Sequence, residues 1–261
     1  MQTPAGITHF GERYIVCDFE QNCLFVLSDD LNVAKKIGEI GSAPLQFLEP
    51  TGVTSTNEFC YVLDAGNNRI QILDTNLQYV EDIPLPSLNH QQGGYRYIDI
   101  AVSDDGILYI STDSTSKEDT QIRIIQNGEV LYSELGINGY LSQANGKVYA
   151  LETLELFEEG DSMVATNGMS HLYELTGETY TEIGVLPNKA TPTDFLVYDG
   201  EFISASASFM KLYSFTWQGD AKNSLCVLPE LSTRCYLIST DTGFILNDAG
   251  KSSMYVMTRK E

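Results

Sequence analysis

Short apolar segments recur along this chain, and Gly, Asn, Asp or Ser residues bound each of them. β-Branched and aromatic residues dominate these segments, which is typical of β-strands, and helical patterns are almost absent. The segments come in pairs that predict hairpins. The predicted strands are residues 13–19, 23–27, 59–63, 69–73, 107–111, 121–125, 147–151, 171–175, 201–205, 211–215, 243–247 and 253–257. The pairs recur about every 40 to 55 residues, the period of a propeller blade rather than of a sandwich strand.

The first two hairpins align without a gap at an offset of 46 residues, as from Pro4 to Pro50. The Pro and Gly residues of each unit are expected to shape the entry to an inner strand. An Asp that ends a strand can accept N–H bonds from the turn that follows, so the aligned Asp residues indicate structure rather than catalysis. The aligned pairs are Pro4 with Pro50, Gly6 with Gly52, Ile7 with Val53, Thr8 with Thr54, Asp18 with Asp64, Asn22 with Asn68, Leu27 with Leu73, and Leu31 with Leu77.

Residues 41–74 resemble the repeat of the NHL β-propeller family. They contain a Gly-rich entry, Gln-Phe, Pro-x-Gly-Val, a Tyr-Val-x-Asp strand end and Gly-Asn-Asn-Arg-Ile-Gln. The other units fit this pattern by spacing, at residues 97–110, 139–151, 193–205 and 234–247. Spacing places these residues at the position of Asp64 in successive units: Asp18, Asp64, Thr112, Glu152, Ser206 and Asn247.

Counting the units predicts an all-β fold, a six-bladed β-propeller of four-stranded antiparallel blades in a single domain over residues 1–261. The approximate blades are residues 1–48, 49–92, 93–135, 136–189, 190–230 and 231–261. The last blade is short, which favours either a minimal closure or a natural chain with residues upstream.

The acidic composition excludes some classes of binding partner. The chain has 36 Asp and Glu residues and 15 Lys and Arg residues, which give a formal net charge of -21. Nucleic acid is not expected as a ligand, since its sequence-independent affinity comes from cations. No run approaches 18 apolar residues, so membrane insertion is not expected either. The N-terminus lacks the pattern of a secretory signal. The compartment stays open, since free thiols favour the cytoplasm and the short last blade leaves room for an export signal upstream.

The chain has five cysteines, Cys17, Cys23, Cys60, Cys226 and Cys235. Cys17 and Cys23 are six residues apart with no neighbouring His, which does not match zinc-ligand spacing. We therefore expect buried, reduced cysteines in place of small apolar residues.

Two long connections depart from the repeat. Residues 153–168 carry Glu155, Glu158, Glu159 and Asp161, oxygen ligands of the type that Ca²⁺ takes, but without the order of a regular calcium loop. Calcium is the one cofactor that this segment suggests, and a solvated hairpin extension is the alternative. Residues 84–96 are rich in amides, and we expect them either to bind a polar ligand or to pack over a neighbouring blade.

A third departure is a set of charges predicted at the mouth of the central channel. When the predicted inner strands are aligned with one another, each blade has one residue at the position of Thr51: Ala5, Thr51, Asp99, Gly139, Thr193 and Arg234. Arg96 and Asp194 lie close to these positions in the sequence. The predicted ligand-binding residues are therefore Arg96, Asp99, Asp194 and Arg234. An Arg would clamp a carboxylate, and Asp99 would accept an amine or hydroxyl. Ordinary surface charges with local partners are the alternative.

Catalytic signals are sparse. Some six-bladed members of the broader family are zinc-dependent lyases with axial histidines, but His9, His90 and His171 do not converge in this projection. No nucleophile elbow or phosphate-binding loop is present. We therefore expect a non-catalytic binding or scaffolding propeller that recognises a protein, peptide or small polar ligand on its loop-bearing face. The alternative is a metal-assisted, calcium-type hydrolase or lyase with its site at the central channel.

Overall fold

The chain is built from β-strands and a few single 3-10 turns. The computed structural model describes residues 1–88, 96–113, 121–136, 138–159, 162–166, 170–186, 192–198, 201–206, 211–215, 221–227, 235–240 and 243–258. Of the helices in these ranges, none has the length and hydropathy needed to cross a membrane. Every one of the twelve predicted strands overlaps an observed strand.

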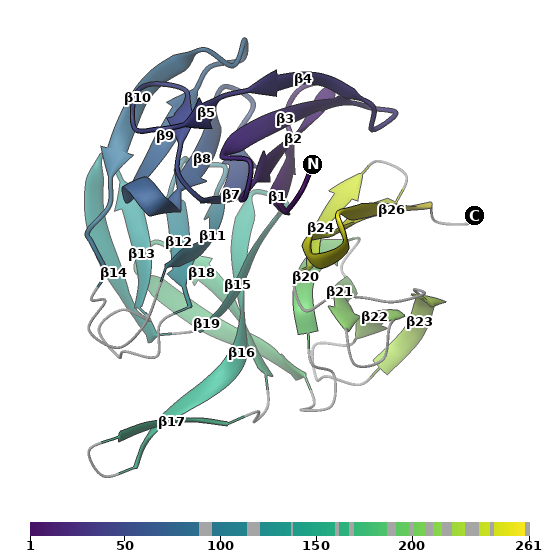
Figure 1. Ribbon diagram of the computed structural model, residues 1–261. Coiled ribbons are helices and arrows are strands. Elements are labelled where there is room, and N and C mark those ends of the chain that lie inside the picture. Colours follow the sequence, from purple (N-terminus) through teal and green to yellow (C-terminus); the bar gives the residue numbers. More distant parts are fainter. Residues whose placement is uncertain are drawn as a thin grey trace. The chain divides into compact units, whose positions relative to one another are not determined.

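Six blades of antiparallel strands form a β-propeller, as predicted (Figure 1). The third and fourth blades belong to one nine-stranded sheet, which the parallel pairing of Thr112 with Asn138 joins. The first blade contains β1 (Pro4–His9), β2 (Arg13–Asp18), β3 (Cys23–Ser28) and β4 (Val33–Ile37), and the second contains β7 (Pro50–Ser55), β8 (Cys60–Asp64), β9 (Arg69–Leu73) and β10 (Tyr79–Pro84). The third contains β11 (Tyr97–Val102), β12 (Leu108–Thr112), β13 (Gln121–Gln126) and β14 (Glu129–Gly136). Between the first two, β5 (Glu39–Ile40) and β6 (Gln46–Phe47) pair in parallel.

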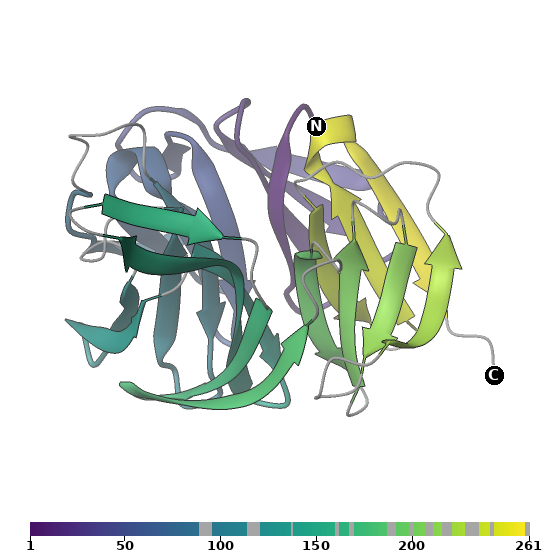
Figure 2. The ribbon, with the colours of Figure 1, turned by 90° about the horizontal axis from the view of Figure 1, so that it is seen from below.

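The fourth blade contains β15 (Asn138–Ala144), β16 (Lys147–Glu159), β18 (Ser170–Thr176) and β19 (Thr179–Leu186). The fifth contains β20 (Pro192–Tyr198), β21 (Glu201–Ser206), β22 (Lys211–Phe215) and β23 (Ala221–Val227), which are the green strands of Figure 2. The sixth has three strands among the described residues, β24 (Cys235–Thr240), β25 (Gly243–Asp248) and β26 (Ser253–Thr258). The predicted limits of the blades and the single domain stay predictions.

The long connection of the fourth blade is a β-hairpin. The end of β16 pairs with β17 (Ser162–Thr166), from Glu155 opposite Thr166 to Glu159 opposite Ser162. This agrees with the hairpin extension that the sequence left as an alternative. Asp161 lies outside the described residues, so the calcium prediction stays a prediction.

The described connection after the second blade packs against the protein. Leu85 and Leu88 are buried, and the Leu85 N–H donates to Asn68 O. The Tyr97 hydroxyl donates to Pro86 O at 2.5 Å. Residues 84–88 therefore pack. Residues 89–95 lie outside the described residues, so the choice between the two expectations for the whole connection stays open.

Contacts divide the chain into two compact units. One consists of Met1–Ser87, Tyr97–Ile100 and Arg234–Glu261, and the other of Leu88–Arg96 and Ala101–Thr233. In the first unit, both ends of the chain meet, because β1 packs against β24 and β25. The Asn247 side chain also donates to Pro4 O at 3.3 Å.

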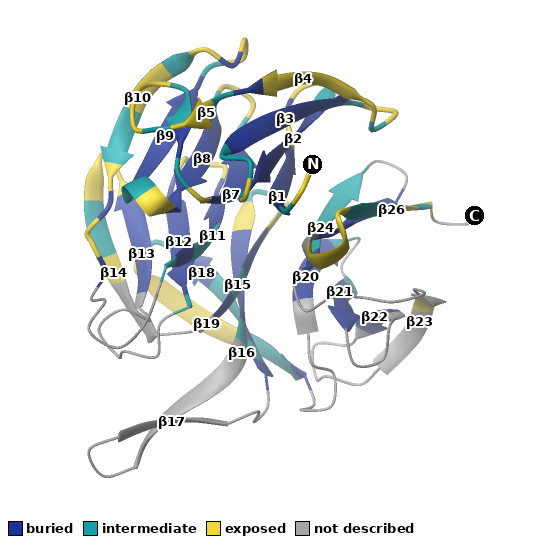
Figure 3. Cartoon of the chain, viewed as in Figure 1, coloured by how far each residue is buried: buried dark blue, intermediate teal, exposed yellow. Residues whose placement is uncertain are grey.

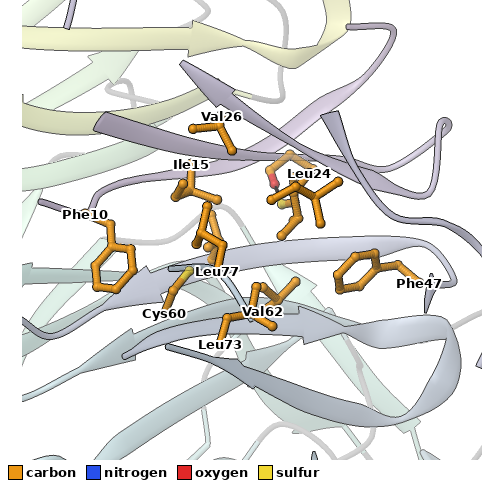
Figure 4. Close-up of a cluster of buried hydrophobic side chains, with 13 residues drawn as sticks. Phe10, Ile15, Leu24, Val26, Phe47, Cys60, Val62, Leu73 and Leu77 are labelled. Atoms are coloured by element: carbon orange, nitrogen blue, oxygen red, sulfur yellow. Dashed lines mark hydrogen bonds between the residues drawn. The ribbon is translucent and has the colours of Figure 1, made fainter. Parts of the chain in front are cut away.

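The core of the first unit follows from the alternation of side chains along β2. Ile15 and Cys17 lie on one face of the first blade and pack in a cluster with Cys60 and Val62 of the second blade (Figure 4). Tyr14, Val16 and their neighbours lie on the other face, in a cluster with Ile245 of the sixth blade. Both faces of the first blade are therefore covered by a neighbouring sheet, in face-to-face packing.

The second unit repeats this arrangement. One cluster joins Tyr109 and Ile124 of the third blade to Val148 and Ala150 of the fourth. On the opposite face of the fourth blade, Leu151 and its neighbours pack in a cluster with the fifth blade. Even numbers along β16 therefore serve one interface and odd numbers the other, which explains why the apolar segments read as nearly continuous.

A glycine pair brings the first two blades close together. Gly6 has φ +78, and a Cβ built there would lie 3.0 Å from Gly52 Cα and 3.1 Å from Val53 N. Both glycines lie where the pairing of a first strand shifts register, between Pro4 and Ile7 and between Pro50 and Gly52. The aligned Gly residues of the repeat are therefore required for close approach and not only for a turn.

The four cysteines whose side chains the structure describes, Cys17, Cys23, Cys60 and Cys235, are buried and free of disulfides. Burial raises the pKa of the Cys60 thiol to about 12, although the charge of Arg13 acts to lower it. Burial also raises the pKa of Cys17 well above its usual value. The observations agree with cysteines that act as small apolar residues.

Gly6→Ala tests the close approach, with Gly11→Ala as its matched control. Gly11 has φ +66 but nothing within 4 Å of a built Cβ, so its substitution adds only backbone strain, about 1 to 2 kcal/mol. Gly6→Ala adds crowding against the second blade and should lower the free energy of unfolding by about 1 to 3 kcal/mol more. Urea unfolding measures both, and equal losses would contradict the packing role.

Thiol labelling tests the buried cysteines. At pH 8, a pKa of about 12 for Cys60 leaves about one thiol in 10,000 as the reactive thiolate. In a Cys226→Ser background, the native protein should carry no label after the time in which iodoacetamide fully labels the urea-unfolded protein. Intact mass gives the number of labels, and rapid labelling of the native protein would show that these thiols are accessible.

Candidate functional site

A buried carboxylate ends the second strand of the second blade. Asp64 is fully buried, and its Oδ1 accepts the N–H of Leu48 at 2.7 Å. Its Oδ2 accepts Arg69 Nε at 2.7 Å and Asn67 Nδ2 at 2.8 Å. The carboxylate therefore joins the turn after its strand to the segment that leads into the blade.

The Arg69 guanidinium is satisfied at every donor. Its remaining N–H groups bind Asp82 Oδ2 and three backbone carbonyls, Ser42 O, Ala43 O and Gln46 O, at 2.8 to 3.2 Å. Gln71 binds the same segment, because its Nε2 donates to Gln46 O and its Oε1 accepts the N–H of Leu45. Side chains of β9 thus hold residues 42–46 against the blade. The sequence analysis did not predict this role for Arg69, although a cation inside an apolar strand was its signal.

The first and third blades use a carboxylate in the same way. Asp18 accepts the N–H groups of Gln2 and Thr3, at 2.5 and 3.2 Å, and that of Gln21 at 3.0 Å. Asp113 Oδ1 accepts the N–H of Arg96 at 2.7 Å. These contacts support the structural interpretation of the repeated Asp.

One position in the predicted series is one residue too early. In the third blade Thr112 does end its strand, as Asp64 does, and the carboxylate acceptor is the next residue, Asp113. In the sixth, Asp248 rather than Asn247 ends β25 and precedes a 3-10 turn, as Asp64 precedes the turn Ala65–Asn67. This error arises because a hairpin turn can begin one residue later without a change in the apolar pattern. Glu152 and Ser206 do occupy the predicted place, opposite Gly139 and Pro192.

Arg96, from the predicted channel mouth, lies directly before β11 and is paired locally. Its Nε is 3.6 Å from Asp113 Oδ2, and about a third of each side chain is exposed. The structure thus brings together Arg96 and Asp113, a partner that the sequence analysis did not name.

The two predicted carboxylates lie on first strands. Asp99 in β11 is half-buried, and its Oδ1 accepts the N–H of Ile100 at 2.8 Å. Asp194 in β20 is buried, and its Oδ1 accepts the N–H of Phe195 at 2.7 Å. Each carboxylate is therefore oriented by the N–H of the next residue.

Arg234 lies outside the described residues. The pairing of β24 with β25 nevertheless bears on its predicted correspondence with Thr51. Cys235 is opposite Asp248, as Pro50 is opposite Asp64, and Tyr236 is opposite Asn247, as Gly52 is opposite Leu63. Because β24 lacks the register shift of β7, it has no residue that corresponds to Thr51, and Arg234 lies before the counterpart of Pro50. Its ligand role stays a prediction.

The described histidines have separate partners. His9 Nε2 is 4.0 Å from Asp29 Oδ1, and His171 Nδ1 is 3.1 Å from Glu182 Oε2. His90 lies outside the described residues. In the part of the chain that the structure describes, no group of three or more His, Cys, Asp or Glu residues is placed to hold a metal ion. The carboxylates of Asp18 and Asp64 do not fit a metal site, because backbone and side-chain N–H donors surround them.

Solved structures with the same fold include both enzymes and a protein from a complex. Virginiamycin B lyase from Staphylococcus aureus has a TM-score of 0.63 and 13% identity, over 99% of this chain and 86% of that chain. A gluconolactonase from Xanthomonas campestris has a TM-score of 0.63 and 11% identity, over 95% and 83%. A chain of the nidogen/laminin complex has a TM-score of 0.58 and 11% identity, over 87% and 81%. No protein-family model matches this sequence, and a search of curated proteins gives no match.

These likenesses define the chain as a six-bladed β-propeller. At 11 to 13% identity they show the fold alone. The NHL-repeat resemblance is a finer statement, which they do not establish.

Asp64→Asn tests the buried clamp. Every partner of the carboxylate is an N–H donor, so the NH₂ group of Asn would face another donor. The substitution also removes the negative charge that pairs with Arg69. Breaking such a pair should lower the free energy of unfolding by about 3 to 5 kcal/mol. Urea unfolding measures this, with the exposed Asp30→Asn as control. A loss no larger than that of the control would show that the clamp contributes little.

Proposed function

We propose that this protein is a non-catalytic binding or scaffolding propeller that recognises a protein, peptide or small polar ligand on its loop-bearing face. The observation that carries the proposal is how the buried carboxylates are used. Asp18 and Asp64 accept N–H groups of the scaffold, and Asp64 also neutralises Arg69. Repeat positions that could have supplied acid or metal chemistry are therefore engaged in holding the blades.

The proposed ligand contacts are Arg96, Asp99, Asp194 and Arg234. Asp99 and Asp194 are oriented by the N–H of the following residue, which favours binding because little side-chain freedom is lost. Arg96 is about a third exposed and is held by Asp113, so it can present a guanidinium to a carboxylate at low entropic cost. A zwitterionic or polar group matches this mixture of charges. Nucleic acid does not, because the net charge is -21.

We also infer that the chain is an NHL-type repeat protein. The match over residues 41–74 gains a physical meaning, since Asp64, Arg69 and Gln71 of that motif hold the Gly-rich entry. A structure of a protein complex with the same fold supports a binding role for such a scaffold.

The second candidate is a metal-assisted hydrolase or lyase of calcium type at the central channel. Two enzymes with this fold, a lyase and a gluconolactonase, favour it. The metal content of protein purified without chelator separates the two candidates. About one tightly held ion per chain would favour the enzyme, and a substoichiometric content would favour the binding propeller.

Free amino acids and dipeptides provide the probe for the proposed contacts. We expect at least one to raise the melting temperature of the wild-type protein and to bind in a calorimetric titration. Arg96→Gln, Asp99→Asn and Arg234→Gln should each weaken its binding about tenfold, the effect of one charge-assisted hydrogen bond. The exposed Asp30→Asn should leave the affinity unchanged. Unchanged affinity in all three variants, with the fold intact, would exclude this site.

A further inference from the structure

Three aromatic rings and one carboxylate share a face of the outer half of the fourth blade. β18 and β19 are the third and fourth strands of this blade, and Tyr173 of β18 lies opposite Glu182 of β19. Side chains two residues apart in a strand lie on the same face. His171 therefore lies on the face of Tyr173, and Tyr180 on the face of Glu182. We call these four residues the tyrosine–glutamate cluster.

Contacts between the side chains agree with this arrangement. The rings of His171 and Tyr173 stack, with centroids 6.2 Å apart and planes inclined by 21°. The rings of Tyr173 and Tyr180 meet edge to face, with centroids 5.6 Å apart and planes at 89°. His171 Nδ1 lies 3.1 Å from Glu182 Oε2. The three rings therefore form a continuous row, and the carboxylate lies beside it.

Solvent reaches the tyrosine–glutamate cluster. Tyr180 is 41% exposed, and the side chains of Glu182 and His171 are 52% and 27% exposed. The first four residues of β19 are all exposed, and Figure 3 shows this part of the strand in yellow. Tyr180 and Glu182 therefore present surface that a dissolved ligand can contact.

The chemistry of the cluster favours an organic cation. The face of an aromatic ring carries partial negative charge and attracts a cation within about 6 Å of its centre. Glu182 adds a full negative charge two residues from Tyr180, and the net charge of -21 attracts cations to the protein as a whole. An organic cation can place methyl groups on a ring and keep its charge close to the carboxylate, which a hydrated inorganic ion cannot do.

We propose that the tyrosine–glutamate cluster binds an organic cation of the quaternary ammonium class. Its methyl groups pack on the exposed ring of Tyr180, and its charge faces Glu182. Two sources carry this group, a free small molecule such as choline and a trimethylated lysine of another polypeptide. The cluster shares no residue with the ligand contacts proposed above. This inference therefore goes beyond the proposed function, and the failure of either one leaves the other standing.

Choline is the first probe, and its neutral carbon isostere is the control. A carbon atom replaces the nitrogen in the isostere, so the two molecules have the same shape and differ in charge. We expect choline to shift the amide resonances of β18 and β19 saturably in two-dimensional NMR spectra, and the isostere to bind at least about fivefold more weakly. The titration is run at pH 8, at which imidazoles are ordinarily neutral and do not compete for a carboxylate. Equal affinity for the isostere would overturn the proposal, because the charge would then contribute nothing.

Substitutions separate the aromatic ring of Tyr180 from its apolar area. Tyr180→Leu should bind choline about fivefold more weakly, the effect of one lost exposed cation–π contact, whereas Tyr180→Phe keeps the ring and should bind as the wild type does. Glu182→Gln should also weaken binding about fivefold, because the carboxylate charge is lost.

Tyr132→Leu is the matched control. Tyr132 is also an exposed tyrosine, 42% exposed, on the fourth strand of a blade, β14. Its ring already has a cation over it, since the guanidinium carbon of Arg123 lies 5.7 Å from the ring centroid. The affinity of this variant for choline should equal that of the wild type.

An otherwise uncharged peptide with one trimethyllysine distinguishes the two sources. Tighter binding of this peptide than of choline would assign the site to a polypeptide partner, and equal or weaker binding would assign it to a free small molecule. Absence of resonance shifts with both probes would overturn the proposal. An unchanged affinity of Tyr180→Leu for choline would also overturn it, since the ring would then take no part in binding.

Discussion

The described structure of the second blade depends on one buried ion pair, between Asp64 and Arg69. A fully buried carboxylate is tolerated only when its charge and lone pairs are satisfied, and Asp64 receives N–H groups from three parts of the chain. Arg69 is equally committed, with five donors divided between two carboxylates and three carbonyls. The pair therefore holds together the end of β8, the start of β9 and the segment that enters the blade.

The first and third blades hold the segments before their first strands with fewer polar groups. Asp18 holds the N-terminal segment without an arginine, and Asp113 holds the segment before β11. Polar groups at the repeated position thus serve the scaffold. The ligand contacts that we propose lie instead where the units differ, as at the carboxylates of Asp99 and Asp194 on first strands.

Strands and their repetition could be predicted because both are local properties. Alternating apolar residues and Gly or Asn turns identify a hairpin wherever they occur, so all twelve predicted strands overlap observed ones. The end of a strand is less constrained, and one predicted position, Asn247, was therefore one residue early. For the sixth blade a signal was present: Asp248, Ala249 and Gly250 repeat Asp64, Ala65 and Gly66. The predicted equivalence of Arg234 with Thr51 fails for another reason, because β24 lacks the register shift that β7 has at Thr51.

By itself, the sequence determined the all-β class, the six units and the strongly acidic charge, because these follow from composition and from patterns within about 50 residues. Only the tertiary structure decided which donors surround Asp64, why Gly6 has no room for a side chain beside Gly52, and that β26 has one described neighbour. The physical reason is distance along the chain. Each of these features depends on atoms from separate strands that approach within a few ångströms, and no local pattern records which segments will meet.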